Sequence, residues 1–413
     1  MSGLELALRR VVSHVVVPSS EPRPTLSLDI IESGSGRLLG EPALASNDGQ
    51  IAFEPGDVLF NKLRPYLAKS YLVEQPMQGS GELLVMRASP RLDPRFLFYV
   101  TLSTRWLNHA TQSSYGLKMP RTSWDELASF KLHVPSLVEQ RRIADFLDNQ
   151  VTRIDAVVAA RKSQVDALVE FRKSRAYAAV TGSSFTEQRS SSLTWAASLP
   201  LAWGEPRICQ VARMGTGHTP SRSVPEYWMG CDIPWLTTGD VHRFRHDEVD
   251  ELDDAVLEIS EIGIANSAAV VHPAGTVALS RTASAGFSIV MGVPMATSQD
   301  YATWTPGPLL SSDFLLWCLR VMRADIMGRL AIGSTHKTIY FPDLMSIRIP
   351  LPTLVEQDAA VGRIQDAARW VSNGCETLRA SIERLTEYKR SFITAAVTGE
   401  FDVSAASGRG VQP

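Results

Sequence analysis

One stretch of this chain occurs twice, and it constrains the fold more than any other feature. The first copy begins with Pro135–Gln140 (PSLVEQ) and closes with Ala178–Gly182 (AAVTG). The second begins with Pro352–Gln357 (PTLVEQ) and closes with Ala395–Gly399 (AAVTG). Start and end are both displaced by 217 residues, so the two copies have the same length. An internal repeat of this kind indicates a duplicated architecture.

Each copy carries the start and stop signals of one long helix. Ser136 with Glu139, and Thr353 with Glu356, form the capping-box pattern, in which the hydroxyl accepts from a backbone N–H and the Glu reaches back. A glycine closes each copy, where a helix needs a left-handed residue. Roughly 42 residues without proline lie between these signals, which corresponds to about 63 Å of helix.

Apolar residues in both copies follow the heptad spacing of a coiled coil. The predicted seam positions are Ala144, Leu147, Val151, Ile154, Val158, Arg161, Val165, Leu168, Val361, Ile364, Ala368, Val371, Cys375, Leu378, Ile382 and Leu385. The two seams share one register, so we predict that the helices pack against each other, antiparallel, about a pseudo-two-fold axis. Arg161 is the charged exception, and its stem can extend to the seam's edge. Two independent helices on separate cores are the alternative.

The segments between the helices have mixed secondary-structure signals. Strand-like runs separated by turns are predicted at 51–53, 57–60, 70–73 and 82–86. A helix from Asp93 to about Asn108, a polar loop at 111–118 and a strand at 130–134 follow. The second segment ends in the same order, with a helix from Ser312 to about Arg329, a polar loop at 333–338 and a strand through Ile347, Ile349 and Leu351.

A weaker correspondence lies inside these segments. Gly56–Lys62 resembles Gly275–Arg281 at a displacement of 219 residues, and in both a buried strand leads to a small polar residue and then a cation. We therefore predict an α+β fold with two mixed α/β domains joined by two long antiparallel helices. The predicted segments are a first domain at 1–134, a first helix at 135–182, a linker at 183–194, a second domain at 195–351, a second helix at 352–399 and a tail at 400–413.

Composition limits the class of protein. A chain of 413 residues with 44% apolar and 21% charged residues is an ordinary globular protein of more than one domain. Its scattered cysteines indicate neither zinc nor disulfides. The mixed, charged N-terminus and the lack of an apolar run near ~20 residues predict a cytoplasmic protein without a membrane segment. A net charge of −3 disfavours a protein that binds nucleic acid on its own. It is still compatible with a DNA-binding protein whose cations are clustered, or with one that shares the phosphate contacts with a partner.

The paired helices with these openings and closings resemble the specificity subunit of type I restriction–modification systems. Further similar segments are Leu28–Leu38, Gly217–Ser221, Ile233–Leu236 and Val397–Val403. The resemblance covers nearly the whole chain, and the double helix motif is its most specific part. The first domain departs from the pattern because it lacks the Leu-Pro-x-x-Trp opening that the second shows at Leu199–Trp203.

The resemblance implies a non-catalytic DNA-recognition subunit that takes part in phage defence. Each mixed domain would be a target recognition domain that reads one half of a gapped, two-part site in double-stranded DNA. The helices would set the gap and dock two methyltransferase subunits, and restriction (translocase) subunits would join. S-adenosylmethionine, ATP and Mg²⁺ would be held by those partners, and this chain would hold no cofactor.

DNA contacts are expected from cations, amides and hydroxyls in loops beside rigid elements, because bidentate groups read bases while Lys, Ser and Thr mostly contact phosphate. The first domain's candidates are Asn61, Lys62, Arg64, Gln112, Ser114, Tyr115, Lys118 and Arg121. The second domain's candidates are Thr216, His218, Arg222, Arg281, Thr282, Ser298, Gln299, His336 and Lys337. Lys62 and Arg281 are favoured because they follow matching strands. We expect Arg281→Ala to weaken binding to the second half-site by about 1–3 kcal/mol if Arg281 reads a base.

Catalytic motifs are absent from the sequence. There is no Asn/Asp-Pro-Pro-aromatic stretch and no Walker phosphate loop. His242 and His246 have metal-ligand spacing, and Asp247 and Asp250 could complete a site, but a solvated polar loop is the simpler interpretation. The acidic run at 247–254 predicts a solvated face turned from DNA or a contact for a basic partner.

Two further functions are compatible with the predicted arrangement of two domains and two long helices. One is a self-contained DNA-modifying or cleaving enzyme with two DNA-binding arms, which the missing catalytic motifs disfavour. The other is a structural adaptor in which the helices serve only as a docking rod. The outer helix faces, with Arg141, Arg142, Asp145 and Asp148, would either dock a partner or be solvated.

Overall fold

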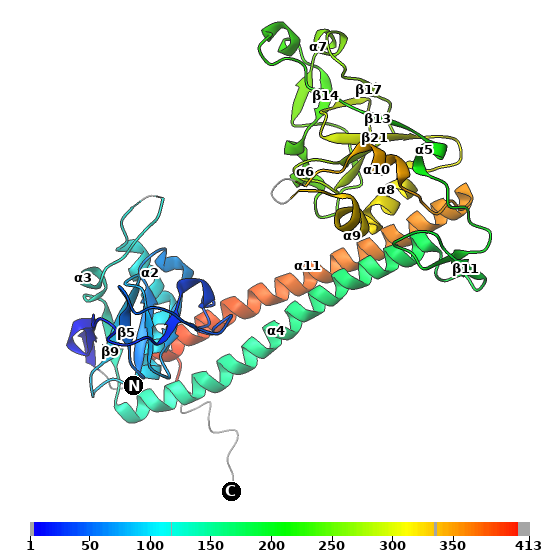
Figure 1. Ribbon diagram of the computed structural model, residues 1–413. Coiled ribbons are helices and arrows are strands. Elements are labelled where there is room, and N and C mark those ends of the chain that lie inside the picture. Colours follow the sequence, from blue (N-terminus) through cyan, green and yellow to red (C-terminus); the bar gives the residue numbers. More distant parts are fainter. Residues whose placement is uncertain (1–3, 117, 334–336, 404–413) are drawn as a thin grey trace. The chain divides into compact units, whose positions relative to one another are not determined.

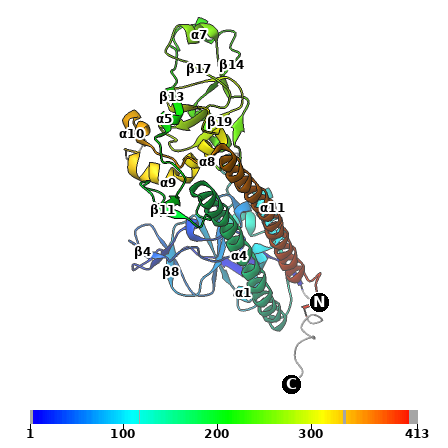
Figure 2. The same ribbon diagram turned by 90° about the vertical axis from the view of Figure 1, so that its right-hand side faces the viewer.

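The structure is a computed structural model that describes residues 4–116, 118–333 and 337–403. It divides into two compact units (Figures 1 and 2). Unit 1 comprises Met1–Gln164 and Thr377–Pro413, and unit 2 comprises Val165–Glu376. Each unit therefore contains one mixed domain and one part of each long helix. None of the helices among the described residues is long and apolar enough to cross a membrane.

The repeated stretch forms two long helices of equal length. Helix α4 (Leu137–Thr181) and helix α11 (Leu354–Thr398) each contain 45 residues, which corresponds to about 67 Å. Both end at the glycines that the sequence indicates, since Gly182 has φ +62° and Gly399 has φ +84°. A residue with a Cβ would be strained in this left-handed conformation.

The two helices pack side by side and antiparallel within each unit. In unit 1 the rings of Phe146 on α4 and Phe392 on α11 are 5.6 Å apart. In unit 2 the rings of Phe171 on α4 and Trp370 on α11 are 5.7 Å apart. All predicted seam residues are buried or half-buried, which confirms the heptad register. Arg161 is half-buried, and its guanidinium donates to Gln164 at 3.1 Å.

A buried ion pair interrupts the seam in unit 1. The Lys389 ammonium lies 2.7 Å from the Asp155 carboxylate, and both side chains are about nine-tenths buried, with 9% and 10% of their surfaces exposed. The positions related to them by the repeat are occupied by Arg172 and Ser372, so unit 2 has no equivalent pair. The heptad pattern does not predict this pair, because Asp155 and Lys389 both stand outside its seam positions.

The domain of unit 1 is built on two sheets. Its main sheet has the strand order β2-β9-β6-β7, and a second sheet has the order β4-β3-β8-β5 with β3 and β8 parallel. A short ribbon pairs β1 with β10. The elements are β1 (Leu4–Ala7), β2 (Val12–His14), β3 (Pro24–Leu26), β4 (Ala43–Leu44), β5 (Ile51–Phe53), β6 (Asp57–Asn61), β7 (Ser70–Leu72), β8 (Met77–Gly79), β9 (Leu83–Ala88), α1 (Pro94–Leu102), α2 (Thr104–Gln112), α3 (Trp124–Leu127) and β10 (Lys131–Val134).

The domain of unit 2 repeats this topology. The order β13-β21-β18-β19 matches that of the main sheet, with β15 added at the edge, and β16-β14-β20-β17 matches the second sheet, including its parallel pair β14 and β20. The elements are β11 (Gln188–Ser190), β12 (Ser198–Pro200), α5 (Ile208–Val211), β13 (Ala212–Thr216), β14 (Ile233–Leu236), α6 (Val241–Phe244), β15 (Glu251–Leu252), β16 (Leu257–Ile259), α7 (Glu261–Ala265), β17 (Val271–His272), β18 (Val277–Ser280), β19 (Ser288–Met291), β20 (Met295–Thr297), β21 (Tyr301–Pro306), α8 (Ser312–Val321), α9 (Arg323–Asp325) and α10 (Phe341–Ser346).

Each domain shares one apolar core with the long helices of its own unit. In unit 1 the fully buried Trp106 belongs to the same cluster as Leu147 of α4 and Val397 of α11. In unit 2 the buried Trp304 belongs to the same cluster as Val180 of α4 and Ile364 of α11. Burial of this apolar surface fixes each domain on its part of the helix pair.

The glutamine of each PxLVEQ motif joins a long helix to its domain. The Gln140 amide accepts from the Asp93 N–H at 2.7 Å and donates to the carbonyls of Arg91 and Pro135. The Gln357 amide makes the same set, accepting from the Ser311 N–H at 2.8 Å and donating to the carbonyls of Leu309 and Pro352. Both side chains are fully buried. Each amide satisfies backbone groups at the start of α1 or α8, which explains why the motif ends in Gln.

Several sequence predictions differ from the structure in detail. The predicted helix at 93–108 is two helices, because Ser103 adopts an extended conformation and accepts from the Trp106 N–H as a new N-cap. The predicted helix at 312–329 is capped by Ser311 and continues after Val321 as α9 and a π-helical turn at Ile326–Leu330.

The end of the second domain and the linker also differ. Ile347 and Ile349 are buried as predicted, but the segment makes only isolated bridges, at Arg348 and Leu351, and is not a strand. The linker predicted at 183–194 contains β11, which pairs with β12.

Candidate nucleic-acid interface

In unit 1, the segment after β6 lies beside the loop that follows α2. The Lys62 N–H donates to the Glu82 carbonyl at 2.9 Å, and the Thr122 N–H donates to the Lys62 carbonyl at 3.0 Å. The Arg64 N–H donates to the Pro120 carbonyl at 2.7 Å, and Arg121 forms bridges with both Leu63 and Tyr115. The structure thus brings together candidates that are distant in sequence.

Unit 2 uses the same construction. The Arg281 N–H donates to the Asp300 carbonyl at 2.7 Å, and the Ile339 N–H donates to the Arg281 carbonyl at 2.8 Å. Thr338 forms bridges with Thr282 and Ile332. This matches unit 1, where Arg121 forms bridges with Leu63 and Tyr115. Lys62 and Arg281 therefore occupy equivalent positions, which supports the 219-residue correspondence between the strands that precede them.

The turn after each of these strands has the same unusual backbone. Arg64 has φ +51° and Ala283, 219 residues later, has φ +60°. Left-handed conformations are uncommon for residues with a Cβ and mark positions that the surrounding structure imposes. The same strained turn is therefore retained in both units.

The charged groups of the unit 1 cluster are partly engaged with one another. Arg121 pairs with Glu82 at 2.8 Å. Burial lowers the pKa of the Lys62 ammonium, the nearby Arg121 lowers it further, and Glu82 opposes this shift. Asn61 is buried, and its amide donates to the carbonyls of Leu63 and Arg64. Asn61 therefore shapes this turn from inside.

Arg281 also makes contacts within its own unit. Its guanidinium donates to the Gln299 carbonyl at 3.0 Å and the Ile339 carbonyl at 3.4 Å. It also lies 4.8 Å from the centre of the Phe341 ring. These contacts use N–H groups that base recognition would need, so Arg281 holds the two neighbouring segments together.

Thr216 and Ser298 of unit 2 bond to the two residues that follow Gln299. The Gln299 side-chain oxygen accepts from the Thr219 hydroxyl at 2.6 Å. The Thr216 hydroxyl donates to the Tyr301 carbonyl at 2.8 Å, and the buried Ser298 hydroxyl donates to Asp300 at 3.1 Å. Gly217 must lack a side chain, because a Cβ there would lie 1.7 Å from the Thr297 carbonyl oxygen.

The remaining candidates are at the surface or outside the described residues. In unit 1, Gln112 at the end of α2, Lys118 and Tyr115 are exposed, and the half-buried Ser114 donates to the Thr111 carbonyl. His218, Arg222 and Lys337 of unit 2 are exposed. His336 lies outside the described residues.

Two residues beside these clusters, His14 and Tyr66, carry no signal in the sequence. The imidazole of His14 stacks on Trp124 at 5.6 Å, and burial lowers its pKa with a further contribution from Lys62. Tyr66 is 51% exposed beside the unit 1 turn. A lone His or Tyr in an irregular segment carries no periodic signal, so only the tertiary structure identifies these side chains.

The acidic run of unit 2 has an intramolecular role that the sequence did not indicate. Asp247 pairs with Arg323 and lies 3.3 Å from the Arg320 guanidinium, and Asp250 also pairs with Arg320. The Arg320 side chain is only 2% exposed. The predicted solvated face is therefore wrong for these two carboxylates, which compensate a buried cation. Among the described residues, no group of His, Cys, Asp and Glu is arranged to hold a metal ion.

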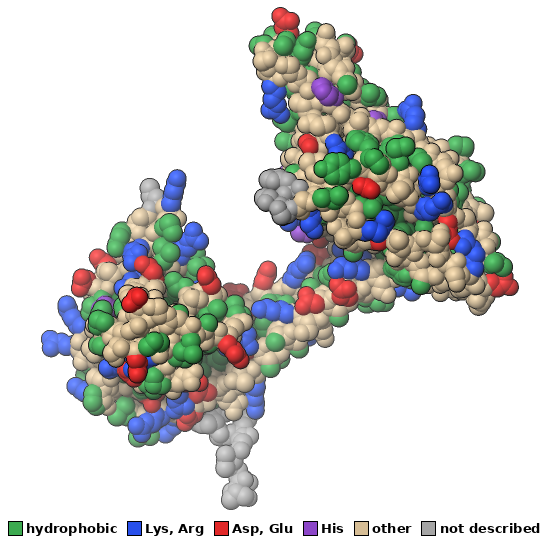
Figure 3. Space-filling view, in the orientation of Figure 1, with side chains coloured by type: hydrophobic (Ala, Val, Ile, Leu, Met, Phe, Trp, Pro, Cys, Tyr) green, Lys and Arg blue, Asp and Glu red, His purple; other side chains and the backbone are tan. Residues whose placement is uncertain are grey.

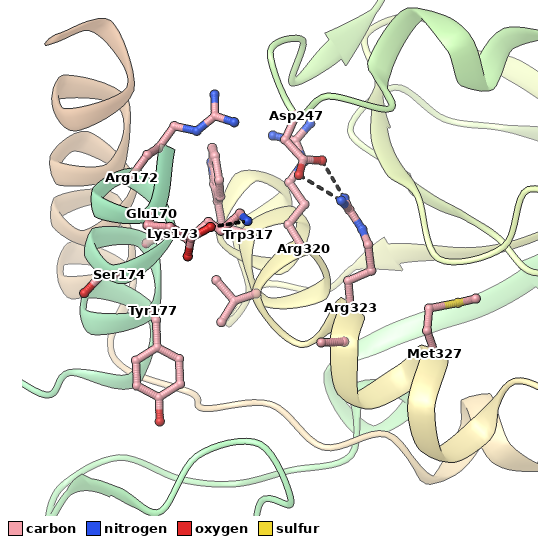
Figure 4. A pocket seen from close by; sticks show the side chains of 13 residues that line it. Glu170, Arg172, Lys173, Ser174, Tyr177, Asp247, Trp317, Arg320, Arg323 and Met327 are labelled. Atoms are coloured by element: carbon pink, nitrogen blue, oxygen red, sulfur yellow. Dashed lines mark hydrogen bonds and ion pairs between the residues drawn. The ribbon is translucent and has the colours of Figure 1, made fainter. Parts of the chain in front are cut away.

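One of these carboxylates, Asp247, borders a pocket of about 720 Å³ between α4 and α8 of unit 2 (Figure 4). Arg172 and Lys173 of α4 line one side, and Arg320 and Arg323 line the other. Trp317 forms part of its wall, and its indole N–H is buried without a partner among the described residues. On the face shown in Figure 3, cations are interspersed with acidic residues and form no continuous basic stripe.

Comparisons with known proteins identify the family. Residues 47–166 and 200–384 match the family described as type I restriction modification DNA specificity domain. The specificity subunit of the type I restriction enzyme MjaIX from Methanocaldococcus jannaschii is 25% identical over 160 residues. That match covers 38% of this chain and 36% of the relative, so the chain spans well under half of its length.

Two solved structures share the fold. A chain from work on complex assembly and conformational transition of the type I R-M system has a TM-score of 0.76 at 20% identity, with 97% of this chain and 99% of that chain covered. The HsdS subunit from Thermoanaerobacter tengcongensis has a TM-score of 0.54 at 21% identity, with 96% and 97% covered. Because the family match covers most of the sequence in two segments, the chain belongs to the family of type I restriction modification DNA specificity domains.

Proposed function

We propose that this chain is the DNA-specificity subunit of a type I restriction–modification complex and that each unit reads one half of a gapped, two-part DNA site. The observation that carries the proposal is the pair of equivalent loop clusters. Each holds a cation, Lys62 or Arg281, between the end of a hairpin and a returning polar loop. Different side chains on one duplicated scaffold would let the two units read different half-sites.

Under this proposal the candidate residues with a described position fall into three groups. Asn61, Arg281 and Ser298 have polar groups engaged by their own unit, and they position the loops. The exposed side chains supply the DNA contacts, and these are Arg64, Gln112, Tyr115, Lys118, His218, Arg222 and Lys337. Lys62, Ser114, Arg121, Thr216, Thr282 and Gln299 are half-buried or internally bonded residues at the edges of the clusters, and His336 is kept as a sequence-based candidate.

The long helices would set the gap and dock two methyltransferase subunits, with restriction subunits joining this core. Exposed aromatic side chains support a docking role, since Trp370 is 60% exposed and Phe171 is 44% exposed beside it in unit 2. Tyr388 of unit 1 is 57% exposed. Exposed aromatic residues are enriched where proteins associate.

The outer face of α4 near its start has another role. Arg95 of α1 pairs with both Asp145 and Asp148, and the Tyr99 hydroxyl donates to Asp148 at 2.6 Å. These carboxylates hold the first domain on its helix. We therefore place the docking surface further along the helices, at the exposed aromatic residues.

The proposal assigns no catalytic residue to this chain. Methyl transfer with S-adenosylmethionine, and translocation with ATP and Mg²⁺, would be carried out by the partner subunits in the cytoplasm. A docking rod without sequence recognition is the second candidate, and the exposed Phe171–Trp370 pair is the observation that favours it.

Co-expression with the cognate methyltransferase subunit and genome-wide mapping of methylated bases tests both functions. We expect one two-part motif with a fixed, unspecific gap. Replacing the exposed Gln112 and Lys118 of unit 1 by Ala should alter or weaken recognition of only one half of that motif. A stable complex that methylates without any sequence motif would leave the docking rod as the function.

A further inference from the structure

The loop that follows β13 in unit 2 is held in one conformation at several points. Gly217 passes against the Thr297 carbonyl, and the Thr219 hydroxyl donates to Gln299 at 2.6 Å. The Trp228 indole N–H donates to the Ser221 carbonyl at 3.2 Å. Arg222 therefore extends from a loop whose backbone is already ordered.

The Arg222 guanidinium rests on two tryptophans. It lies 5.6 Å from the centre of the Trp228 ring and 6.0 Å from that of the fully buried Trp235. Such cation–π contacts hold the planar group in place without using its N–H donors. The side chain is exposed, so the donors are available to a ligand.

Arg222 differs in its electrostatic surroundings from three arginines of its domain that are held by carboxylates. Arg243, Arg320 and Arg323 each pair with at least one carboxylate. Within the described part of the chain, Arg222 has no such partner. Its charge is oriented by the protein but not compensated by it, as expected for a cation that meets an anionic ligand.

The neighbours of Arg222 indicate which anion it meets. Ser221 and Ser223 flank it, both are exposed, and their hydroxyl oxygens are 2.8 Å apart. An arginine fork between two short hydroxyl side chains suits the oxygens of a phosphate. Base recognition would require a side chain free to extend toward the floor of a groove about 8.5 Å deep. The guanidinium of Arg222 is instead held back on the indole rings.

We propose that Arg222, Ser221 and Ser223 form a phosphodiester-binding site that positions the backbone of the second half-site while other side chains read its bases. This inference rests on the proposed DNA-recognition function. Trp228 and Trp235 would be positioning residues that hold the guanidinium in place.

The test uses the full chain in complex with its methyltransferase subunit and a duplex that contains the motif found for the wild type. Arg222→Gln removes the charge, and Arg245→Gln is the matched control, because Arg245 is also an exposed arginine of the same domain. Arg222→Lys keeps the charge but loses the planar fork. Melting temperatures of the variants verify that each one folds.

We expect Arg222→Gln to bind the duplex several-fold more weakly, with Arg222→Lys in between and Arg245→Gln unchanged. One lost phosphate contact reduces the salt dependence of log Kobs by about 0.9. The ratio of the wild-type binding constant to that of Arg222→Gln should therefore fall about 3.5-fold between 50 and 200 mM salt. The methylated motif should stay the same.

Two results would overturn the inference. A change in the preferred base at one position of the second half-site would make Arg222 a base reader, and an unchanged affinity and salt slope would remove it from the interface. Failure of the wild-type complex to methylate any two-part motif would instead contradict the proposed function itself.

Discussion

Single buried polar residues contribute to the attachment of each domain to its long helix. Gln140 and Gln357 are fully buried, and each amide bonds three backbone groups from two segments of its unit. These bonds stabilise the fold mainly because their absence would leave backbone groups unpaired away from water.

Gln357→Leu should therefore destabilise unit 2 strongly. It would leave the Ser311 N–H and the carbonyls of Leu309 and Pro352 without their partner, at a cost of roughly 1–3 kcal/mol for each buried group left unpaired. Urea denaturation of the purified chain measures this loss. Gln365→Ala, on a half-buried position of the same helix, is the control and should cost far less.

Arg281 illustrates how tertiary contacts change the meaning of a residue. Its guanidinium binds two carbonyls and stacks on Phe341. Arg281→Ala should lower the stability of the chain by about 1–2 kcal/mol and weaken DNA binding, because the two segments that it joins would loosen.

Comparing thermal unfolding with the methylated motif separates this role from base reading. We expect a lower melting temperature and an unaltered motif. A relaxed base preference with undiminished stability would show that Arg281 reads a base after all.

At the scale of elements, the helix pair contains one strong asymmetry. The buried pair of Asp155 and Lys389 belongs to unit 1 alone. A buried charge is costly when its partner is removed, whereas an apolar pair of similar size is often as stable as the ion pair or more so.

Lys389→Met should consequently destabilise unit 1 by about 3–5 kcal/mol, because it leaves the Asp155 carboxylate uncompensated. The double variant Asp155→Leu with Lys389→Met should recover most or all of that loss. Denaturant unfolding of the single and double variants measures the coupling. Additive losses would mean that the two side chains do not interact as the structure shows.

The start of α11 gives a pH dependence. Hydrogen bonds from the Thr353 side chain and backbone lower the pKa of Glu356, burial opposes the shift, and the Trp203 indole N–H lowers it further. A lowered pKa means that the carboxylate stabilises the folded state at pH values above its unfolded pKa. The contribution disappears as pH falls through the lower folded value.

Glu356→Gln should thus be less stable than the wild type near neutral pH, with the difference vanishing in acid. Melting temperatures measured for both chains from pH 7 to pH 3 provide the check. A difference that stayed constant over this range would exclude the carboxylate as its cause.

At the scale of the whole molecule, the same arrangement of one mixed domain followed by one long helix occurs twice. The two domains share strand order, parallel strand pairs and the bonds that fix their loops. The long helices have equal length and end in equivalent left-handed glycines. Under the proposed function, two reading units connected by helices of fixed length recognise half-sites at a fixed spacing.

Inserting one heptad into both helices should lengthen the unspecific gap. Seven residues add about 10.5 Å of helix, which equals about 3 base pairs at 3.4 Å each. The insertions belong after Gln164 and before Thr377, where the two units meet along the chain. Mapping of methylated bases measures the gap, and an unchanged gap would mean that the helices do not set it.

The sequence by itself determined the features that rest on local pattern and chain length. The repeat, the closing glycines and the seam of α4 and α11 follow from which residues stand at which spacing, and the structure confirms them. The capping box is complete at Thr353 and Glu356. At Ser136 the hydroxyl accepts from the Glu139 N–H, but the Glu139 carboxylate pairs with Arg142. The placement of Lys62 and Arg281 after matching strands could be predicted for the same reason, because a duplicated strand retains its pattern.

Only the tertiary structure decided which polar side chains remain available for a ligand. Arg281 and Asp247 look like surface residues in the sequence, yet partners 58 and 76 residues away bind them. Arg222 looks no different from them, but it rests on Trp228 and Trp235 with its donors exposed. Hydrogen bonds and ion pairs depend on distances in space, and the spacing of residues along the chain does not give these distances. More of the fold than of the candidate site could therefore be predicted from the sequence.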